Sequence, residues 1–274
     1  MNYAHELEQA CDFARRAGDT LLRVYETHFG YELKGEVDPV TEADRLANTY
    51  LVNALRSAFP TDGVVAEESA DISDALDKTR CWYVDPLDGT KEFIKKNGEF
   101  SVMVGLAVEG RSVLGVVYQP VTDKLYTGIP GVGATLSAQG DTRSLRVSDV
   151  GEAARLRLVT SRSHRSEGVD QIVSALGIEH QAVSGSVGLK VGLIAEQVAD
   201  LYVHLSDRSC AWDACAPEAI LRAAGGCFTD LAGRPFMYGG TDMRSRHGIL
   251  ACNTAAFDAV LPVVQSVAKA ANLI

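Results

Sequence analysis

Residues 82–93 read Trp82-Tyr83-Val84-Asp85-Pro86-Leu87-Asp88-Gly89-Thr90-Lys91-Glu92-Phe93, an apolar run that ends on two closely spaced carboxylates. Residues 81–84 favour a buried β-strand. Because Pro86 has no backbone N–H to donate, the sequence predicts that the chain leaves the sheet after Asp85. Asp85 and Asp88 then project from one short loop. Two carboxylates held close together repel unless a proton or a cation lies between them, so the pattern indicates a site for a hard divalent metal ion.

The sequence of the same stretch is also typical of a β-turn. Asp-Pro-Leu-Asp-Gly is rich in residues that tolerate turn geometry. Gly89 permits unusual backbone angles, and Thr90 adds a hydroxyl beside the carboxylates. This stretch alone is therefore consistent with either a turn or a metal site. The two interpretations are distinguished by motifs in the rest of the chain.

The composition is that of an ordinary globular protein. Of the 274 residues, 46% are hydrophobic and 23% are charged, which suits one large domain or two closely packed ones. The 26 basic and 36 acidic residues give a net charge of −10. This charge argues against binding long nucleic acid, whereas a small anionic ligand is compatible if metal ions offset the charge. No stretch approaches the roughly 18 apolar residues of a membrane span, and the N-terminus does not resemble a signal peptide, so a cytoplasmic location is expected.

The first half of the chain predicts an α+β part with an antiparallel sheet. The expected elements are helices over residues 5–25 and from 42 to before Pro60, a strand over 63–66, a hairpin over 101–108 and 112–118, and a Gly-rich excursion over 128–140. Thr41 and Asp44 resemble the two halves of a capping box at the start of the second helix. The strand over 63–66 runs into Glu67, so a second apolar run ends on an acidic side chain.

In the second half, from about residue 156, short strands alternate with helices, which is the pattern of βαβ units. The expected strands are 156–160, 182–183, 200–204, 228 and 249–251, and the expected helices are 169–176, one from 188, 212–224 and 254–271. Asp213 lies in the first turn of a helix, where an acidic residue interacts well with the helix dipole without any other role. The change of pattern divides the chain into parts 1–150 and 151–274.

Three separated motifs resemble, in the same order, the inositol monophosphatase superfamily of Mg²⁺-dependent, lithium-sensitive phosphatases. They are Glu67-Glu68-Ser69, Trp82-x-x-Asp85-Pro86-Leu87-Asp88-Gly89-Thr90, and Trp212-Asp213 followed by the helix to Gly225-Gly226. The resemblance covers almost the full chain. Thr90 is followed by Lys91-Glu92-Phe93, where inositol monophosphatases usually have Thr-Asn-Phe. Together with Ser161-Arg162-Ser163-His164, this makes the chain most similar to the superfamily's 3′(2′),5′-bisphosphate nucleotidases of the CysQ type.

The resemblance implies a five-layer αβαβα sandwich in which an α+β part and an α/β part meet at the active site. It also implies two Mg²⁺ ions. Glu67, Asp85 and the Leu87 carbonyl would ligate one ion, and Asp85, Asp88 and Asp213 the second, with Glu67 helping to place a third, weaker ion. Oxygen ligands suit Mg²⁺, and a pair of ions ~3.5–4 Å apart can activate water and stabilise a departing ester oxygen.

The resemblance assigns roles to further side chains. Asp44 and Thr90 match positions that accept a proton from the attacking water and orient it, with Glu67 as a second acceptor for the Thr90 relay. Backbone N–H groups around Gly89 and Thr90 would bind the scissile phosphate. The residues that align with nucleotide or second-phosphate contacts are His164, Ser186, Lys190 and Arg208. The simpler alternatives are a helix cap for Asp44, a solvated loop for His164 and a surface charge for Lys190.

The function that the resemblance implies is hydrolysis of the 3′-phosphate of adenosine 3′,5′-bisphosphate, giving AMP and phosphate by attack of metal-activated water. Sensitivity to lithium follows from the same resemblance. One alternative keeps the site but acts on inositol phosphates or other small sugar phosphates. Another is a metal- and phosphate-binding protein without turnover. Because many members of the superfamily are dimers, a homodimer is among the assemblies that the resemblance implies.

Overall fold

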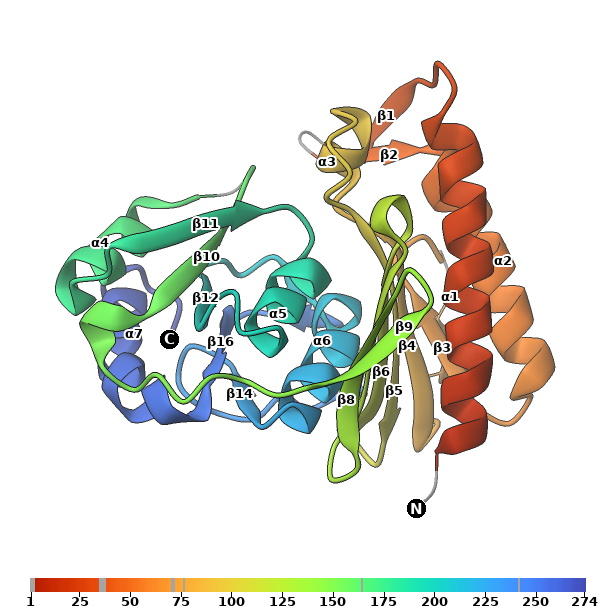
Figure 1. Ribbon diagram of the computed structural model, residues 1–274. Coiled ribbons are helices and arrows are strands. Elements are labelled where there is room, and N and C mark those ends of the chain that lie inside the picture. The colour runs from red at the N-terminus through yellow and green to blue at the C-terminus, as the bar shows by residue number, and fades with distance from the viewer. Residues whose placement is uncertain (1–2, 35–37, 70–71, 76, 164, 241) are drawn as a thin grey trace.

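Helices and sheets alternate in five layers in the computed structural model, which describes residues 3–34, 38–69, 72–75, 77–163, 165–240 and 242–274. The layers are α1 and α2, a first sheet, α5 and α6, a second sheet, and α4 and α7 (Figure 1). The helices are α1 (Ala4–Tyr25), α2 (Glu42–Ala58), α4 (Glu167–Leu176), α5 (Val187–Ala195), α6 (Ala211–Ala223) and α7 (Phe257–Ala270). This order confirms the predicted αβαβα sandwich. None of the helices in the described residues has the length and apolarity that a membrane crossing requires.

The first sheet lies against α1 and α2 and holds, within the described residues, seven strands in sequence order. They are β3 (Gly63–Ala66), β4 (Arg80–Asp88), β5 (Ser101–Val108), β6 (Arg111–Gln119), β7 (Lys124–Ile129), β8 (Gly133–Ala138) and β9 (Asp141–Leu145). All neighbours are antiparallel except β3 and β4, which run parallel. The expected Gly-rich excursion over 128–140 was wrong, because these residues complete β7 and form β8. Gly131, in the turn between the two strands, and Gly133, at the start of β8, have positive φ, a conformation that favours glycine.

Strand β4 does not end at Asp85 as predicted. Asp85 lies opposite Met103 and Asp88 opposite Ser101, so three steps along β4 match two along β5. The strand therefore bulges by one residue and resumes. Pro86 lies inside this bulge, where its missing N–H is tolerated.

The second sheet has the strand order β11-β10-β12-β16-β14 in the part of the chain that the structure describes. Its strands are β10 (Arg157–Ser161), β11 (His180–Ser184), β12 (Leu201–His204), β14 (Gly226–Thr229) and β16 (Ile249–Asn253). Strand β10 is parallel to β11 and β12, which confirms the βαβ pattern for these three strands. Strand β16 pairs antiparallel with both β12 and β14, so the sheet as a whole is mixed.

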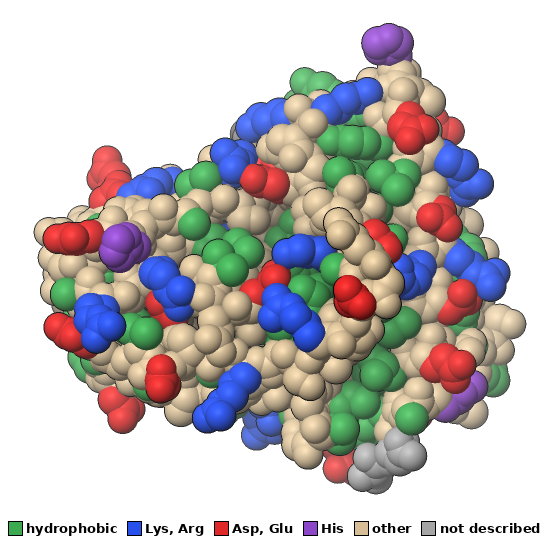
Figure 2. All heavy atoms as spheres, viewed as in Figure 1, with side chains coloured by type: hydrophobic (Ala, Val, Ile, Leu, Met, Phe, Trp, Pro, Cys, Tyr) green, Lys and Arg blue, Asp and Glu red, His purple; other side chains and the backbone are tan. Residues whose placement is uncertain are grey.

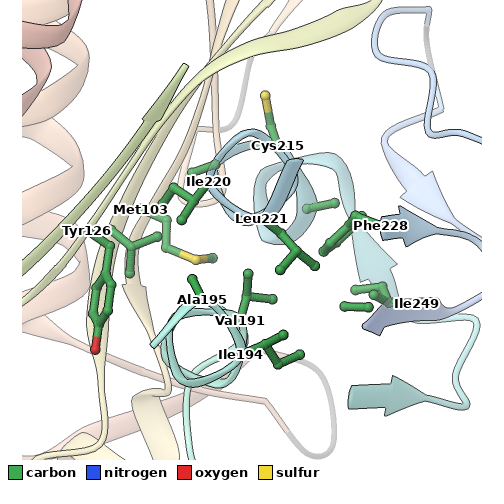
Figure 3. Packing of buried hydrophobic residues seen from close by; sticks show 14 of the residues in the cluster. Met103, Tyr126, Val191, Ile194, Ala195, Cys215, Ile220, Leu221, Phe228 and Ile249 are labelled. Atoms are coloured by element: carbon green, nitrogen blue, oxygen red, sulfur yellow. The ribbon is translucent and has the colours of Figure 1, made fainter. Parts of the chain in front are cut away.

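One hydrophobic core extends from the first sheet to the second. Met103 and Tyr126 contribute from the first sheet, Val191 from α5, and Phe228 and Ile249 from the second sheet (Figure 3). The boundary expected near residue 150 falls between β9 and β10, in the segment that joins the two sheets. Because the core is continuous across both sheets, a division into separate domains 1–150 and 151–274 stays a prediction.

Three glycines set the distance between the first sheet and α6. Gly105, Gly115 and Gly128 lie directly opposite one another on β5, β6 and β7. A Cβ atom on Gly115 would lie 2.1 Å from the Ala216 carbonyl oxygen, and Gly105 and Gly128 face the α6 backbone almost as closely. The helix therefore lies directly on the sheet, and this contact fixes its first turn, which carries Asp213.

Candidate active site

The parallel strands β3 and β4 place two carboxylates side by side at one end of the first sheet. Ala66 lies opposite Val84, and the Glu67 N–H donates to the Val84 carbonyl oxygen at 3.1 Å. Glu67, directly after β3, therefore lies beside Asp85, which belongs to β4. The Asp85 side chain is 3% exposed, and its Oδ1 accepts the Leu87 N–H at 2.9 Å, which stabilises the bulge.

Asp88 ends β4, and Gly89 turns the chain into the short helix α3 (Thr90–Ile94). Gly89 has φ 100°, a conformation that favours glycine. A Cβ atom there would also lie 3.0 Å from the Glu99 carbonyl oxygen. Glycine at this position therefore permits both the backbone angle and the close approach of residue 99, and it places Thr90 directly beside Asp88.

Two further carboxylates come from the first turns of α2 and α6, where each completes a capping box. The Thr41 N–H donates to Asp44 Oδ2 at 2.7 Å, and the Cys210 N–H donates to Asp213 Oδ2 at 2.7 Å. The structure thus confirms that Asp44 caps α2 and that Asp213 lies in the first turn of α6. In both cases the cap also fixes the direction of a carboxylate that reaches the same region as Asp85.

Thr90 links Asp44 to the end of β4. Its hydroxyl lies 3.1 Å from Asp44 Oδ1 and 3.2 Å from the Leu87 carbonyl oxygen. Because a hydroxyl has one proton, it donates to one of these acceptors at a time. Asp44 is 1% exposed, and burial raises the pKa of its carboxyl while hydrogen bonds from Thr41 oppose the shift.

The carboxylates at the end of β4 destabilise one another's charged forms. Burial, followed by the charge of Glu67, raises the pKa of Asp85 and the pKa of Asp213 well above ordinary values. Burial also raises the pKa of Asp88, against the opposing charge of Lys190. A divalent cation bound among these groups would offset this repulsion.

Two lysines lie close to the carboxylates. Lys34, from β1 (Tyr31–Lys34), donates to Glu67 at 3.1 Å and to Glu68. This pairing outweighs burial and raises the pKa of Lys34. Lys190, on α5, is 2% exposed, and burial lowers its pKa to about 8 although Asp88 opposes the shift. The site thus carries more negative than positive groups.

A pocket of about 200 Å³ opens between α3 and the start of α5. The predicted site residues that line it are Glu67, Asp88, Gly89, Thr90, Ser186, Lys190 and Asp213. Figure 2 shows basic side chains beside the notch between the two sheets, at the level of α3. Arg208 is exposed and is not among the residues that line this pocket. His164 lies outside the described residues.

Several residues of the pocket wall were not predicted as site residues, although Ser161 and Glu92 lie in motifs that carry the resemblance. Ser161 ends β10, and Tyr202 and His204 lie two apart on β12, so they share a face. Glu92 adds a buried carboxylate from α3. The signal that points to Ser161 and His204 is their position at the carboxyl ends of parallel strands, where ligands bind in α/β sheets.

The donor set fits a hard cation such as Mg²⁺, because its side-chain donors are carboxylate oxygens and the Leu87 carbonyl lies beside them. Among the described residues, no three His, Cys, Asp or Glu side chains already converge on one point as a complete metal site. The charges of Glu67, Asp88 and Asp213 nevertheless all act on Asp85. The number of ions and the ligands of each therefore stay predictions.

The chain is similar to known proteins over most of its length. A model of the inositol monophosphatase family matches residues 2–268. The 3′(2′),5′-bisphosphate nucleotidase CysQ of Salmonella typhimurium is 40% identical over 235 residues, which are 85% of this chain and 93% of the relative. A crystal structure of CysQ from Bacteroides thetaiotaomicron has a TM-score of 0.78 at 29% identity, covering 92% of this chain and 98% of its own. The extragenic suppressor protein suhB from Bartonella henselae has a TM-score of 0.82 at 28% identity, covering 96% and 99%.

Proposed function

The chain belongs to the inositol monophosphatase family, and from that premise we propose that it is a Mg²⁺-dependent 3′(2′),5′-bisphosphate nucleotidase. It removes the 3′-phosphate of adenosine 3′,5′-bisphosphate and gives AMP and phosphate. Sensitivity to lithium is part of the same proposal. The observation that supports this chemistry best is the meeting of Glu67, Asp85, Asp88 and Asp213 beside a pocket that also holds the Thr90 hydroxyl.

The ligands proposed for Mg²⁺ are the four carboxylates and the Leu87 carbonyl. When bound there, the ions would polarise the phosphate, lower the pKa of a bound water and stabilise the departing ester oxygen. The protein contributes the fixed directions of these oxygens. Asp85 is held by the bulge of β4 and Asp213 by its helix cap, so neither side chain has to be ordered when substrate binds.

Thr90 and Asp44 are the proposed relay for the proton of the attacking water. Thr41 occupies Asp44 Oδ2 with both its N–H and its hydroxyl, at 2.7 and 2.6 Å, which leaves Oδ1 for Thr90. A water that donates to the Thr90 hydroxyl oxygen can therefore pass its proton through Thr90 to Asp44. The raised pKa of Asp44 makes it a better acceptor than an exposed aspartate.

Substrate contacts are proposed on both sides of the pocket. Backbone N–H groups of Gly89 and Thr90 bind the scissile phosphate, where the absence of a side chain on Gly89 lets the backbone approach closely. Lys91, on the same rim, supplies positive charge to the substrate. His204 also lines the pocket, with its ring stacked on Tyr202 at a centroid distance of 6.3 Å, and is proposed to donate to the second phosphate.

The nucleotide is favoured as substrate by the relatives named above and by Lys91-Glu92-Phe93 after Thr90. We would measure kcat/KM in Mg²⁺ for adenosine 3′,5′-bisphosphate, its sulfated analogue, inositol 1-phosphate and fructose 1,6-bisphosphate. The proposal expects the two nucleotides to be hydrolysed fastest. Faster hydrolysis of inositol 1-phosphate would instead support the sugar-phosphate alternative, which uses the same site. Binding without turnover of any of these esters would support a non-catalytic protein.

A further inference from the structure

Part of the pocket is formed by the ends of two neighbouring strands of the second sheet. Leu158 on β10 lies opposite Leu201 on β12, and three residues further along these parallel strands are Ser161 and His204. Both of these residues line the pocket. Other lining residues belong to the first half of the chain, at Gly89 and on α3. A substrate that contacts both groups therefore depends on how the two halves are held together.

Arg162, directly after Ser161, binds the first half of the chain through its side chain. Its Nε and Nη2 donate to the two carboxylate oxygens of Glu99, each at 2.6 Å. Such a bidentate pair fixes the relative orientation of the two side chains as well as their distance. Neither Arg162 nor Glu99 is among the residues that line the pocket. The ion pair thus joins the end of β10 to the segment after α3 from outside the pocket.

The backbone of Glu99 packs against the turn that follows Asp88. A Cβ atom on Gly89 would lie 3.0 Å from the Glu99 carbonyl oxygen, so the two segments are in close contact. The same carbonyl oxygen accepts the Ser186 N–H at 3.2 Å. The Glu99 side chain therefore extends from a backbone that is fixed beside Gly89, and the ion pair sets the position of Arg162 relative to that turn.

A second contact joins the same two segments. Ser163 Oγ donates to Glu92 Oε1 at 2.5 Å and accepts a hydrogen bond from Lys95 Nζ at 3.1 Å. Glu92 lies on α3, and Lys95 is the residue that ends this helix. Because Ser163 follows Arg162, two consecutive residues after β10 are bonded to the region of α3. The end of β10 is thus held at two neighbouring positions.

We propose that Arg162 and Glu99 are positioning residues for the substrate. Their ion pair holds Ser161 and His204 at the distance from Gly89 that a bisphosphate requires. The inference rests on the proposed function, which assigns the scissile phosphate to Gly89 and the second phosphate to His204. A monophosphate does not have to contact both groups, so the ion pair contributes to specificity. Because the two side chains are 38% and 24% exposed, water screens the pair and the expected effect is moderate.

The test replaces Arg162 by Gln and Glu99 by Gln, singly and together. Both kcat and KM are measured in Mg²⁺ for adenosine 3′,5′-bisphosphate and for adenosine 3′-phosphate, which lacks the second phosphate. We expect each single variant to raise KM for the bisphosphate about 3- to 10-fold, with a smaller effect on the monophosphate and little change in kcat. The double variant should be no worse than the single variants, because all three lose the same interaction.

The charge of Glu99 also acts on Lys190, which lines the pocket. The double variant keeps the net charge and therefore separates the loss of the pair from a change in charge. Exchanging the two residues, by Arg162→Glu with Glu99→Arg, should recover part of the affinity for the bisphosphate. Arg162→Lys should also recover part of it, since lysine keeps the charge but not the bidentate geometry.

Arg16→Gln is the matched control. It removes an ion pair with Asp12 on the outer helix α1, where both side chains are also partly exposed. This variant should leave both KM values unchanged.

Three results would overturn the inference. A raised KM in Arg162→Gln with an unchanged KM in Glu99→Gln would show that Arg162 binds the substrate directly. An equal rise in KM for both nucleotides would show that the pair acts on the whole site and not on the second phosphate. Unchanged KM for the bisphosphate in all three variants would show that the pair has no positioning role.

Hydrogen exchange of the peptides that contain β10 and α3 gives a measurement that needs no substrate. We expect faster exchange in both segments of the double variant, because they lose a contact that holds them together. If the wild type hydrolyses neither nucleotide, the proposed function fails. The exchange rates then still decide whether the ion pair fixes the end of β10, and unchanged rates would contradict it.

Discussion

At the scale of single residues, each of the four aspartates of the site also has a structural hydrogen bond. Asp85 accepts the Leu87 N–H inside the bulge, Asp44 and Asp213 cap helices, and Asp88 holds the start of α5. These bonds need an oxygen acceptor, whereas metal binding needs the charge. Replacing carboxylate by amide therefore separates the structural role from the chemical one.

Asp88→Asn should abolish phosphatase activity and leave the fold intact. The amide oxygen can still accept from Ser186 and Gly188, but the side chain loses the charge that binds the cation. Because the neutral amide also relieves repulsion among buried carboxylates, the free energy of unfolding without divalent ions should be unchanged or higher. Circular dichroism and urea denaturation measure the fold, and phosphate release measures the activity. Retained activity would contradict the assignment of Asp88 as a metal ligand.

Thr90→Ala should lower kcat about 10²- to 10⁴-fold with little change in KM, because it removes the relay to Asp44 but leaves the phosphate-binding backbone in place. Thr90→Ser keeps the hydroxyl at the same position and should retain most of the activity. Steady-state kinetics of the two variants measure this difference. Equal losses in both would show that Thr90 acts by packing and not through its hydroxyl.

The sequence was sufficient to name most of the carboxylates but not most of the pocket wall. Glu67, Asp85 and Asp88 follow apolar runs, so local pattern identifies them. Ser186 and Lys190 line the pocket, so their contacts with substrate stay predictions. The sequence does not show that their polar atoms also bond Asp88 and the backbone. His204 escaped notice because it contributes only through the alignment of separate strands, which is a tertiary property.

At the scale of elements, the position of α6 depends on the glycines of three neighbouring strands. We expected Gly128 to begin a Gly-rich excursion, since glycine is common in turns. The pairing of the strands shows that Gly128 instead allows close packing, because Gly128, Gly115 and Gly105 lie side by side under α6. Pro86 was misread for a similar reason, because a bulge tolerates a proline that a regular central strand does not.

Gly115→Ala should destabilise the protein and weaken the site together. The new Cβ atom would lie 2.1 Å from the Ala216 carbonyl oxygen, so α6 must move away from the sheet and take Asp213 with it. We expect a loss of at least about 2 kcal/mol in the free energy of unfolding and weaker Mg²⁺ binding. Gly30→Ala is the matched control, because a Cβ atom there meets nothing within 4 Å. Urea denaturation of both variants measures the difference, and equal stability would contradict the close packing of α6.

At the scale of the whole molecule, the two sheets are tied together by contacts that are far apart in sequence. Arg162 forms a bidentate ion pair with Glu99 at 2.6 Å, and the Ser186 N–H donates to the Glu99 carbonyl oxygen. Asp200, which is 0% exposed, joins the segment between the sheets to the start of β10, accepting from Ser148 and Arg157. The site lies across this junction, so its geometry depends on both halves.

Asp200→Asn should lower the free energy of unfolding by about 2 to 3 kcal/mol at neutral pH, since the amide cannot replace the charge that faces Arg157. Burial alone raises the pKa of Asp200, but hydrogen bonds from Arg157 and Ser148 outweigh it and leave the pKa below its ordinary value. The stabilising contribution is therefore complete above the ordinary pKa of about 4 and is lost as pH falls through the lower pKa of the folded protein. Urea denaturation of wild type and variant should show a difference that shrinks below about pH 4. A difference that stays constant with pH would contradict this role.

The most direct test of the account is the identity of the product. The protein is incubated with adenosine 3′,5′-bisphosphate, with Mg²⁺ or with a chelator, and the nucleotide formed is separated by chromatography. We expect AMP carrying its phosphate at the 5′ position, formed in step with free phosphate. It should form only when Mg²⁺ is present, and not with Asp88→Asn. Adenosine 3′-phosphate as the product, the same rate in the chelator, or no hydrolysis in Mg²⁺ would contradict it.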